Sequence, residues 1–355
     1  MSRFLRPTLE GLAPYVPGEQ PRAGVYVKLN TNESPFPPSP AVLEAINRDE
    51  TARLRLYSDP TALPLKQAIA ETYGLTPGNV FCGNGSDEVL GLSFLAFAQG
   101  TVVAPAVSYG FYPVFARLFG LKMREVHLRE DFSLPVENFE NAGAMVVLAN
   151  PNAPTGLALS LEDVERIVAG NPDHVVLVDE AYVDFGAQSA LPLIRRYPHL
   201  LIVRTFSKSR SLAGARLGYA LADAALIDDL ERVRNSFHPY NINRLSLLAG
   251  VAAMRDTAYF DRCVQAVVAQ RDRTAQALRG MGFHVTDSRA NFLFAAHPAF
   301  TARAYYQALK ARGVLIRCWD DPRLREHARI SIGSDADMTR FLQETRAILA
   351  ERSIP

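Results

Sequence analysis

The chain has 355 residues and a mass of 39.1 kDa, long enough for one large domain and a smaller second one. Hydrophobic residues make up 48% and charged residues 21%, and 38 Lys and Arg against 37 Asp and Glu leave a formal net charge of +1. Because basic and acidic residues are nearly equal in number, the composition indicates neither a basic surface for nucleic acid nor an acidic tail. Because only five of the basic residues are lysines, a mechanism that needs a lysine has few candidates.

The cysteine count and the lengths of the apolar runs indicate in which cellular compartment the protein is expected. Cys82, Cys263 and Cys318 are odd in number and lack metal-ligand spacing, so we expect neither a disulfide framework nor a bound metal. The first residues lack the apolar stretch of a secretory signal. The longest apolar runs, such as Ala144–Ala149, are far shorter than the roughly 20 residues that span a bilayer. We therefore expect a cytoplasmic protein that does not contact membranes.

The first 35 residues are expected to be irregular, because closely spaced prolines remove helix donors and hold the chain extended. From about Pro40, helix-like stretches alternate with short apolar runs. Five of these runs are expected to be buried strands: Val102–Ala104, Ala144–Ala149, Val175–Val178, Leu201–Arg204 and Leu217–Leu221. Between them, Leu161–Ala169 is expected to be a helix capped by Ser160. This alternation predicts an α/β fold with a mostly parallel sheet flanked by helices.

The pattern changes after about residue 235. Helical stretches are expected at roughly 240–256, 258–281, 299–312 and 335–351, with strands at Phe283–Thr286, Asn291–Ala296, Val314–Arg317 and Arg329–Ile332. They predict a smaller α+β domain. We therefore divide the chain into an arm (1–35), a large domain (36–240) and a small domain (241–355). The arm is expected to contribute to the small domain and to cover a ligand site, since clefts between domains commonly bind ligands.

The sharpest local signal follows a predicted strand, in the segment Thr205–Arg216. Lys208 lies between Ser207 and Ser209, and Arg216 ends the segment. A lysine at a strand end suits an amine that forms a Schiff base, while hydroxyls and an arginine suit an anion such as phosphate. A solvated basic loop is the alternative interpretation of this segment alone.

Asp179 ends another predicted strand, at the edge where open α/β sheets bind their ligands. A buried carboxylate there is able to keep a pyridinium nitrogen protonated, and Tyr182, three residues on, is within reach of the same ring. The alternative is a Mg²⁺-binding acid of a nucleotide hydrolase. That alternative requires a GxxxxGK[ST] phosphate loop, which this sequence lacks.

Three further segments follow predicted strands. Ser86 and Asp87 begin a helical stretch, whose N-terminal N–H groups favour a phosphate, although the same residues also suit a simple cap. Tyr109 belongs to an aromatic cluster that suits ring stacking, although such a cluster is more often core. Asn152 lies in the rigid turn Asn150–Gly156. Together, a phosphate site, a stacking ring, an acid and one lysine describe pyridoxal 5′-phosphate.

In these segments the sequence resembles the fold-type I pyridoxal-phosphate aminotransferases, and among them the histidinol-phosphate aminotransferase family. The resemblance extends over essentially the whole chain. The segments that carry it are Leu29–Pro35, Gly83–Glu88, Asn150–Gly156, Asp179–Tyr182, Ser207 and Lys208 with Arg216, and Ala328–Gly333. It implies a large pyridoxal-phosphate-binding domain with a mostly parallel sheet, and a small α+β domain.

The resemblance implies a role for each candidate at the cofactor. Lys208 is expected to form the Schiff base and to shuttle a proton, and Asp179 to pair with the pyridinium nitrogen. Tyr182 is expected to bond the ring's phenolic oxygen, and Tyr109 to stack on the ring. The phosphate is expected to be bound by Ser86, Asp87, Ser207 and Arg216, the first two through their backbone amides.

The resemblance also implies partners and substrate contacts. Tyr57 matches a tyrosine that reaches the phosphate in the partner subunit, so the active form is expected to be a homodimer. Arg329 matches the arginine that holds the substrate's acidic end, and Arg317 one associated with the phosphate of histidinol phosphate. On the arm, Tyr15 is expected to close over the substrate and Asn32 to contact it.

One position departs from the family pattern. The family commonly has an asparagine that bonds the ring oxygen where this chain has Ala153. Either Asn152 takes its place, or Tyr182 bonds that oxygen alone. The loss of one hydrogen bond, worth about 0.5–1.5 kcal/mol, is expected to tune the Schiff-base pKa rather than abolish activity.

The implied reaction is a ping-pong transamination between glutamate and imidazole-acetol phosphate, giving 2-oxoglutarate and histidinol phosphate. An aromatic amino-acid aminotransferase or a phosphothreonine decarboxylase of the same fold would use nearly the same residues. Arg317 beside Arg329 favours a phosphorylated substrate, because guanidinium groups match phosphate geometry. The presence of both Lys208 and Asp179 favours an enzyme over a catalytically inactive binding protein. The net charge of only +1 argues against a transcription regulator that binds DNA.

Overall fold

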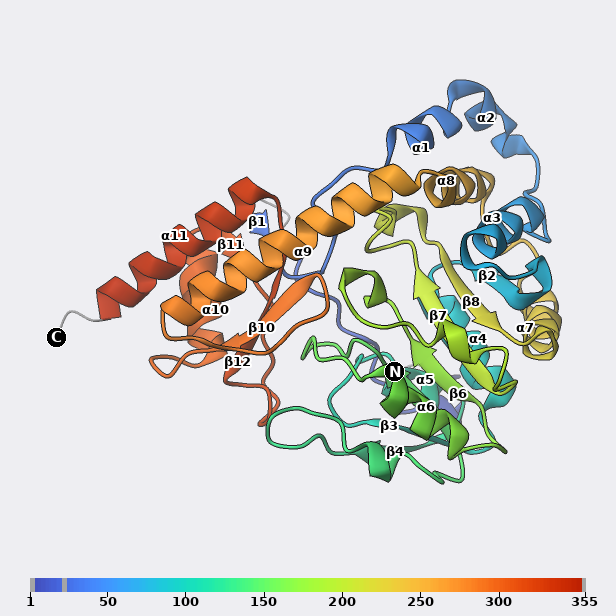
Figure 1. The fold of residues 1–355 in the computed structure, drawn as a ribbon, viewed down its shortest axis with the longest axis horizontal. Coiled ribbons are helices and arrows are strands. Elements are labelled where there is room, and N and C mark those ends of the chain that lie inside the picture. The colour runs from blue at the N-terminus through green and yellow to red at the C-terminus, as the bar shows by residue number, and fades with distance from the viewer. Residues whose placement is uncertain (1–3, 21–23, 353–355) are drawn as a thin grey trace.

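The computed structural model describes residues 4–20 and 24–352 and is organised around a seven-stranded sheet (Figure 1). Its order is β2-β8-β7-β6-β5-β3-β4. The strands are β2 (Val80–Gly83), β3 (Thr101–Pro105), β4 (Lys122–Val126), β5 (Met145–Ala149), β6 (Val176–Asp179), β7 (Leu200–Thr205) and β8 (Gly218–Ala222). Only β8 runs against its neighbours β7 and β2. The predicted mostly parallel α/β sheet is therefore confirmed, as are its five predicted strands.

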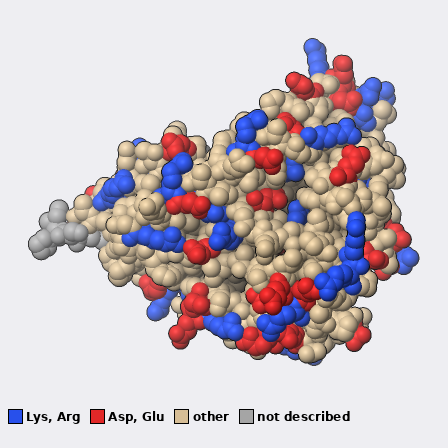
Figure 2. Space-filling model, viewed as in Figure 1, with Lys and Arg blue, Asp and Glu red and all other residues tan. Residues whose placement is uncertain are grey.

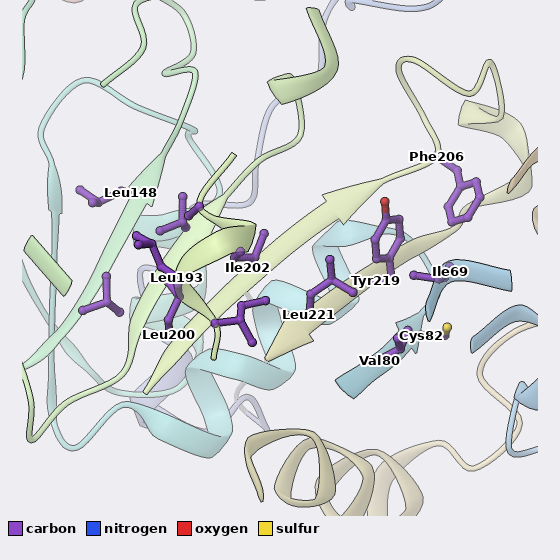
Figure 3. Close-up of a cluster of buried hydrophobic side chains, with 14 of the residues drawn as sticks. Ile69, Val80, Cys82, Leu148, Leu193, Leu200, Ile202, Phe206, Tyr219 and Leu221 are labelled. Carbon is purple, nitrogen blue, oxygen red and sulfur yellow. The ribbon is translucent and has the colours of Figure 1, made fainter. Parts of the chain in front are cut away.

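Strands β2 and β4 were not predicted. The residues of β4 are exposed or half-buried, so its sequence carries no apolar run. The central strands are apolar on both faces because helices cover both. In β7, Leu200 and Ile202 pack into one hydrophobic cluster, while Leu201 and Val203 pack into another on the opposite face. Figure 3 shows the first of these clusters.

Helices cover the two faces of this sheet. They are α1 (Pro40–Ala45), α2 (Arg48–Ala52), α3 (Leu63–Tyr73), α4 (Ser86–Phe97), α5 (Tyr112–Leu118), α6 (Leu161–Ala169), α7 (Ala224–Phe237) and α8 (Arg244–Arg255). Helix α6 begins as predicted, because the Ser160 side chain accepts a hydrogen bond from the backbone N–H of Asp163. Short 3-10 helices occupy Pro7–Leu9, Arg53–Arg55, Pro77–Asn79, Val136–Asn138, Val183–Phe185, Leu191–Leu193 and Ala213–Ala215.

A second unit follows and has its own hydrophobic cluster. Its elements are α9 (Thr257–Gly280), β9 (His284–Val285), β10 (Phe292–Ala296), α10 (Ala302–Ala311), β11 (Val314–Leu315), β12 (His327–Ser331) and α11 (Asp335–Arg352). The strands β12-β10-β9 form an antiparallel sheet. Helix α9 extends from this unit to α8 beside the large sheet (Figure 1). The expected α+β texture of this part is confirmed.

Part of the N-terminal arm packs with the second unit. Its strand β1 (Val27–Lys28) pairs in parallel with β11, and Leu29 is buried in the second unit's cluster. Helix α8, beyond the predicted boundary at residue 240, packs instead on α1 and α3 of the first unit. The three-part division of the chain stays a prediction.

The surface gives no strong electrostatic signal. Figure 2 shows acidic and basic side chains mixed over the face that it displays. Within residues 4–20 and 24–352, no helix is long and apolar enough to cross a membrane. The same residues contain no group of three or more His, Cys, Asp or Glu side chains able to hold a metal ion. The cytoplasmic location stays a prediction.

Candidate active site

The predicted site residues meet beyond the carboxyl ends of β5, β6 and β7. A cavity of about 210 Å³ there is lined by Ser86, Asp87, Tyr109, Asp179, Tyr182, Ser207, Lys208 and Arg216. An adjoining cavity of about 360 Å³ is lined by Tyr15, Asn32, Arg317 and Arg329. Tyr109, Tyr182 and Lys208 line both. The structure thus joins one compartment of acid, amine and hydroxyls to another that contains two guanidinium groups.

Asp179 is the last residue of β6 and is buried. The Tyr112 hydroxyl donates to its Oδ2 at 2.9 Å, and the backbone N–H of Ala181 donates to its Oδ1 at 3.1 Å. Burial raises the pKa of Asp179 to about 6, although both hydrogen bonds oppose that rise. A bound cation would reverse the cost of burying this carboxylate, so the position fits a protonated ring nitrogen.

Lys208 follows β7 and brings a primary amine to the boundary between the two cavities. Its Nζ donates to the backbone carbonyl of Thr31 at 3.4 Å and lies 5.7 Å from the centre of the Tyr182 ring. Among the described residues, no carboxylate lies within ion-pair distance of this amine. Apart from the hydrogen bond to Thr31, the Lys208 amine therefore has no ion-pair partner among the described residues, which suits an amine that forms a Schiff base.

The N-terminus of α4 forms a backbone cradle on the other side of the first cavity. No side chain caps this helix, which leaves the N–H groups of Ser86 and Asp87 to a ligand. A Cβ at Gly218 would lie 2.3 Å from the Ser86 nitrogen, so only glycine lets β8 approach so closely. Arg216, with a positive φ of 52°, brings its guanidinium to the same place. The cradle fits a phosphate.

The Asp87 carboxylate, which lies beside this cradle, is already paired with two other side chains. Tyr109 donates to its Oδ1 at 2.8 Å, and the Arg216 Nη2 donates to its Oδ2 at 3.0 Å. Asp87 therefore fixes the Tyr109 ring and the Arg216 fork, while its own backbone amide stays available. Burial raises the pKa of Tyr109 far above its ordinary value, so this ring stays neutral and suited to stacking.

Arg329 dominates the second cavity. Its Nη2 donates to the Asn30 carbonyl at 3.0 Å, but its Nε is buried and has no hydrogen-bond partner among the described residues. The guanidinium lies 5.6 Å from the centre of the Trp319 ring, and burial lowers its pKa. A half-buried guanidinium whose Nε is buried, and which has no carboxylate partner among the described residues, fits an anionic ligand.

Arg317 lies beside Arg329, because the two backbones exchange hydrogen bonds as an isolated bridge. Its two terminal nitrogens donate to the carbonyls of Val16 and Pro17 at 3.1 Å each. Arg317 thus holds the arm against the cavity. The arm in turn places Tyr15 on Phe111, with ring centres 4.8 Å apart.

Two predicted residues are not brought to this site. The Asn152 amide donates to the Val107 carbonyl and to Thr155 Oγ1 and accepts from Ser108, and it lines a separate cavity of about 380 Å³. Its neighbour Ala153 lines the site instead. Tyr57 is 80% exposed and stacks on Tyr240, away from both cavities of its own chain.

Three features escaped the sequence analysis. Tyr112 stands in the predicted aromatic cluster, but spacing alone does not show that its hydroxyl reaches Asp179. Trp319 lies close to both arginines of the second cavity. Glu180, next to Asp179, is fully buried in an ion pair with Arg204, which fixes the ends of β6 and β7. An acid after one apolar run and an arginine at the end of another gave no indication that the two residues pair.

With this geometry in place, comparison with known proteins identifies the class. The family model described as aminotransferase class I and II matches residues 25–344, so the chain belongs to that family. It is 46% identical over 350 residues to the histidinol-phosphate aminotransferase of Chromohalobacter salexigens, covering 98% of this chain and 99% of that protein. It is 49% identical over 343 residues to that of Marinomonas sp., covering 95% and 97%. Within the class, it is a member of the histidinol-phosphate aminotransferases.

A solved structure agrees. The histidinol-phosphate aminotransferase of Sinorhizobium meliloti, in complex with pyridoxal-5′-phosphate, superposes with a TM-score of 0.85 at 27% identity. The match covers 98% of this chain and 99% of that one. The fold-type I architecture and the family expected from the sequence are both confirmed.

Proposed function

We propose that this chain is a pyridoxal-phosphate-dependent aminotransferase that interconverts histidinol phosphate and 2-oxoglutarate with imidazole-acetol phosphate and glutamate. The observation that carries the proposal is the buried, unpartnered Nε of Arg329 in a cavity that shares Lys208 with the cradle at α4. The anion site at Arg329 and the phosphate cradle at α4 belong to adjoining cavities, and the Lys208 amine, which has no ion-pair partner among the described residues, lines both. This arrangement suits an acidic substrate that lies beside a phosphorylated cofactor.

The residues present fit the cofactor. The α4 amides of Ser86 and Asp87, with Ser207 and Arg216, would hold its phosphate, and Asp179 would hold its ring nitrogen. When bound, pyridoxal phosphate supplies a carbonyl carbon that takes up the amino group and a ring that withdraws electrons from it. Asp179 stabilises the ring's positive charge because it is a carboxylate whose two oxygens already accept hydrogen bonds.

Lys208 carries the proton transfer in this proposal. It lines both cavities, so its amine reaches the cofactor side and the substrate side without a change of fold. The amine takes a proton from the substrate's α carbon and returns it on the cofactor side. Tyr109 and Tyr15, whose rings lie 5.9 Å apart, exclude water from one wall of the site.

Arg329 and Arg317 give the substrate its orientation. Both guanidinium groups match a phosphate or a carboxylate through paired N–H donors. The carbon that bears the amino group carries a phosphorylated CH2OH group in histidinol phosphate and a carboxylate in glutamate, so one pair of arginines serves both half-reactions. Arg317 lines the cavity while it donates to the carbonyls of Val16 and Pro17, and these contacts keep Tyr15 beside the bound ligand.

A half-reaction assay tests this function. The holoenzyme is mixed separately with histidinol phosphate, phenylalanine, tyrosine and phosphothreonine, and the cofactor's visible band is followed. Rapid loss of that band with histidinol phosphate, and slow loss with the others, is the expected result. A preference for phenylalanine or tyrosine would keep the Lys208 chemistry but assign the enzyme to aromatic amino acids. Release of carbon dioxide from phosphothreonine would indicate a decarboxylase.

The active form in this proposal is a homodimer in which Tyr57 reaches the partner's phosphate cradle. Its support is the exposed aromatic surface formed by Tyr57, Tyr240 and Phe237, of which Tyr57 is 80% and Phe237 is 75% exposed. Surfaces of this kind are typical of interfaces.

Mixing two inactive variants tests the shared site. Lys208→Ala and Tyr57→Ala damage different residues of the same composite site. In a mixed dimer one site carries both defects and the other carries neither. When chains pair at random, about half of the dimers are mixed, and each mixed dimer has one intact site of two. We therefore expect the mixture to recover up to roughly a quarter of the wild-type activity. No recovery in verified mixed dimers would show that Tyr57 acts within its own chain.

A further inference from the structure

A single buried asparagine connects the arm to the wall between the two cavities. Asn32 is 1% exposed and has a positive φ of 55°, a conformation that asparagine tolerates better than most residues. Its Nδ2 donates to the Tyr182 hydroxyl oxygen at 3.0 Å, across 150 residues of sequence. Its backbone carbonyl accepts from Asn291 at 3.1 Å. The Asn32 backbone is thus fixed independently of its side chain.

The hydrogen-bond directions around Asn32 are determined by the atoms involved. The Asn32 backbone N–H, which is always a donor, donates to Ser331 Oγ at 2.8 Å. The Ser331 hydroxyl donates its own hydrogen to Asn32 Oδ1, also at 2.8 Å. The remaining half of the amide must therefore be the NH₂ group, which faces Tyr182. This chain of bonds makes the Tyr182 oxygen an acceptor.

The consequence falls on the Tyr182 hydrogen. Because its oxygen accepts from Asn32, Tyr182 has to direct its own hydrogen elsewhere. Among the described residues it has no second hydrogen-bond partner, and it lines the cavity that contains Asp179 and Lys208. The same cavity is lined by Pro151 and by Ala153, against whose cluster Tyr182 packs, and neither of the two has a polar side chain. On this side of the cavity, Tyr182 is the hydroxyl that a ligand oxygen meets.

We infer that Asn32 is a positioning residue, which with Ser331 commits the Tyr182 hydroxyl to donate to the ring oxygen of the bound cofactor. The inference rests on the proposed function for the identity of that cofactor. It gives Asn32 a role beyond substrate contact, and it explains how one tyrosine serves where Ala153 offers no donor. A donor at the ring oxygen stabilises the form of the bound cofactor that has lost its proton.

Reversing one bond tests the inference. Asn32→Asp keeps the shape, but its carboxylate accepts from Tyr182 and draws the hydrogen away from the cavity. The readout is the pH midpoint of the absorbance change of bound pyridoxal phosphate, without substrate. We expect Asn32→Asp to raise that midpoint by roughly one pH unit, the size of one hydrogen bond to a charged group. Ser331→Ala, which frees the amide to turn over, should raise it by less.

Two comparisons separate positioning from general damage. Asn171→Asp is the matched control, since Asn171 is a buried asparagine with three hydrogen bonds in the large core and does not line either cavity. It should lower the midpoint of thermal unfolding and leave the spectral midpoint unchanged. In a Tyr182→Phe background, Asn32→Asp should cause no further spectral shift, because its target hydroxyl is gone.

The outcomes are distinct. A spectral midpoint that Asn32→Asp leaves within about 0.2 of wild type, or that shifts equally in the Tyr182→Phe background, would overturn the inference. If Asn32→Asp fails to fold, Ser331→Ala decides alone, and an unchanged midpoint there overturns it as well. A wild-type protein that binds pyridoxal phosphate without a pH-dependent visible band, and does not transaminate, would instead overturn the proposed function.

Discussion

The neighbours Asp179 and Glu180 make opposite contributions to stability, and replacing each by its amide shows why. Glu180 is paired with Arg204, whereas Asp179 accepts hydrogen bonds only from the neutral donors Tyr112 and Ala181. In Asp179→Asn, Oδ1 still accepts from Ala181 and the new NH₂ group donates to the Tyr112 oxygen. The variant therefore removes the buried charge, but the Tyr112 hydroxyl hydrogen loses the oxygen that accepted it.

The magnitude follows from the pKa of Asp179. Burial raises that pKa from 3.8 to about 6, so the folded apoprotein holds its proton at a pH where the unfolded chain has lost it. The contribution of Asp179 to the stability of the wild-type apoprotein consequently falls as pH rises from about 4 to 6 and then levels off. The difference corresponds to about 3 kcal/mol. We expect Asp179→Asn to raise the free energy of unfolding of the apoprotein by about 1–2 kcal/mol at pH 8, because the cost of the unpaired Tyr112 hydrogen offsets part of the gain.

The assay is urea unfolding of the apoproteins between pH 4 and 8, followed by circular dichroism. The gain should be absent near pH 4 and complete above pH 6.5. Affinity for pyridoxal phosphate should fall at least about 100-fold, because the pyridinium loses its buried counter-charge. Glu180→Gln is the control: it takes the nearer carboxylate from the buried Arg204, which keeps only Asp184 at 3.6 Å, and should cost about 3 kcal/mol at pH 8. An Asp179→Asn apoprotein no more stable than wild type at pH 8 would refute this reasoning.

Three further predictions follow from the site. Lys208→Ala should lose the visible band of the bound cofactor and nearly all turnover, as measured by absorbance and by the half-reaction; full activity would reject the site. Arg329→Lys keeps the charge but not the fork, so kcat/KM for histidinol phosphate should fall about 10- to 100-fold, and an unchanged value would remove Arg329 from the anion site. Arg317→Ala releases the arm, so chymotryptic cleavage after Tyr15 should become several-fold faster; equal cleavage rates would show that the arm is held by other contacts.

Much of the architecture was readable in the sequence. Buried parallel strands appear as apolar runs. The bounds of the strand that ends at Asp179 and of the strand that precedes Lys208 were therefore predicted to within two residues. The helix that begins at Leu161 was predicted from the capping residue Ser160. Strand β4 was missed because its exposed position lets charged residues occupy it. Local pattern is informative where burial dictates composition, and silent where it does not.

The sequence by itself determined the chemistry of the site: one lysine after a strand, one acid at a strand end and glycines before a helix. Tertiary structure alone decided which atoms meet. It turned Asn152 away from the site, directed Tyr112 to Asp179 and joined Asn32 to Tyr182. The physical reason is that spacing along the chain sets the order of side chains, whereas the direction of a hydrogen bond depends on packing between segments that are 67 to 150 residues apart.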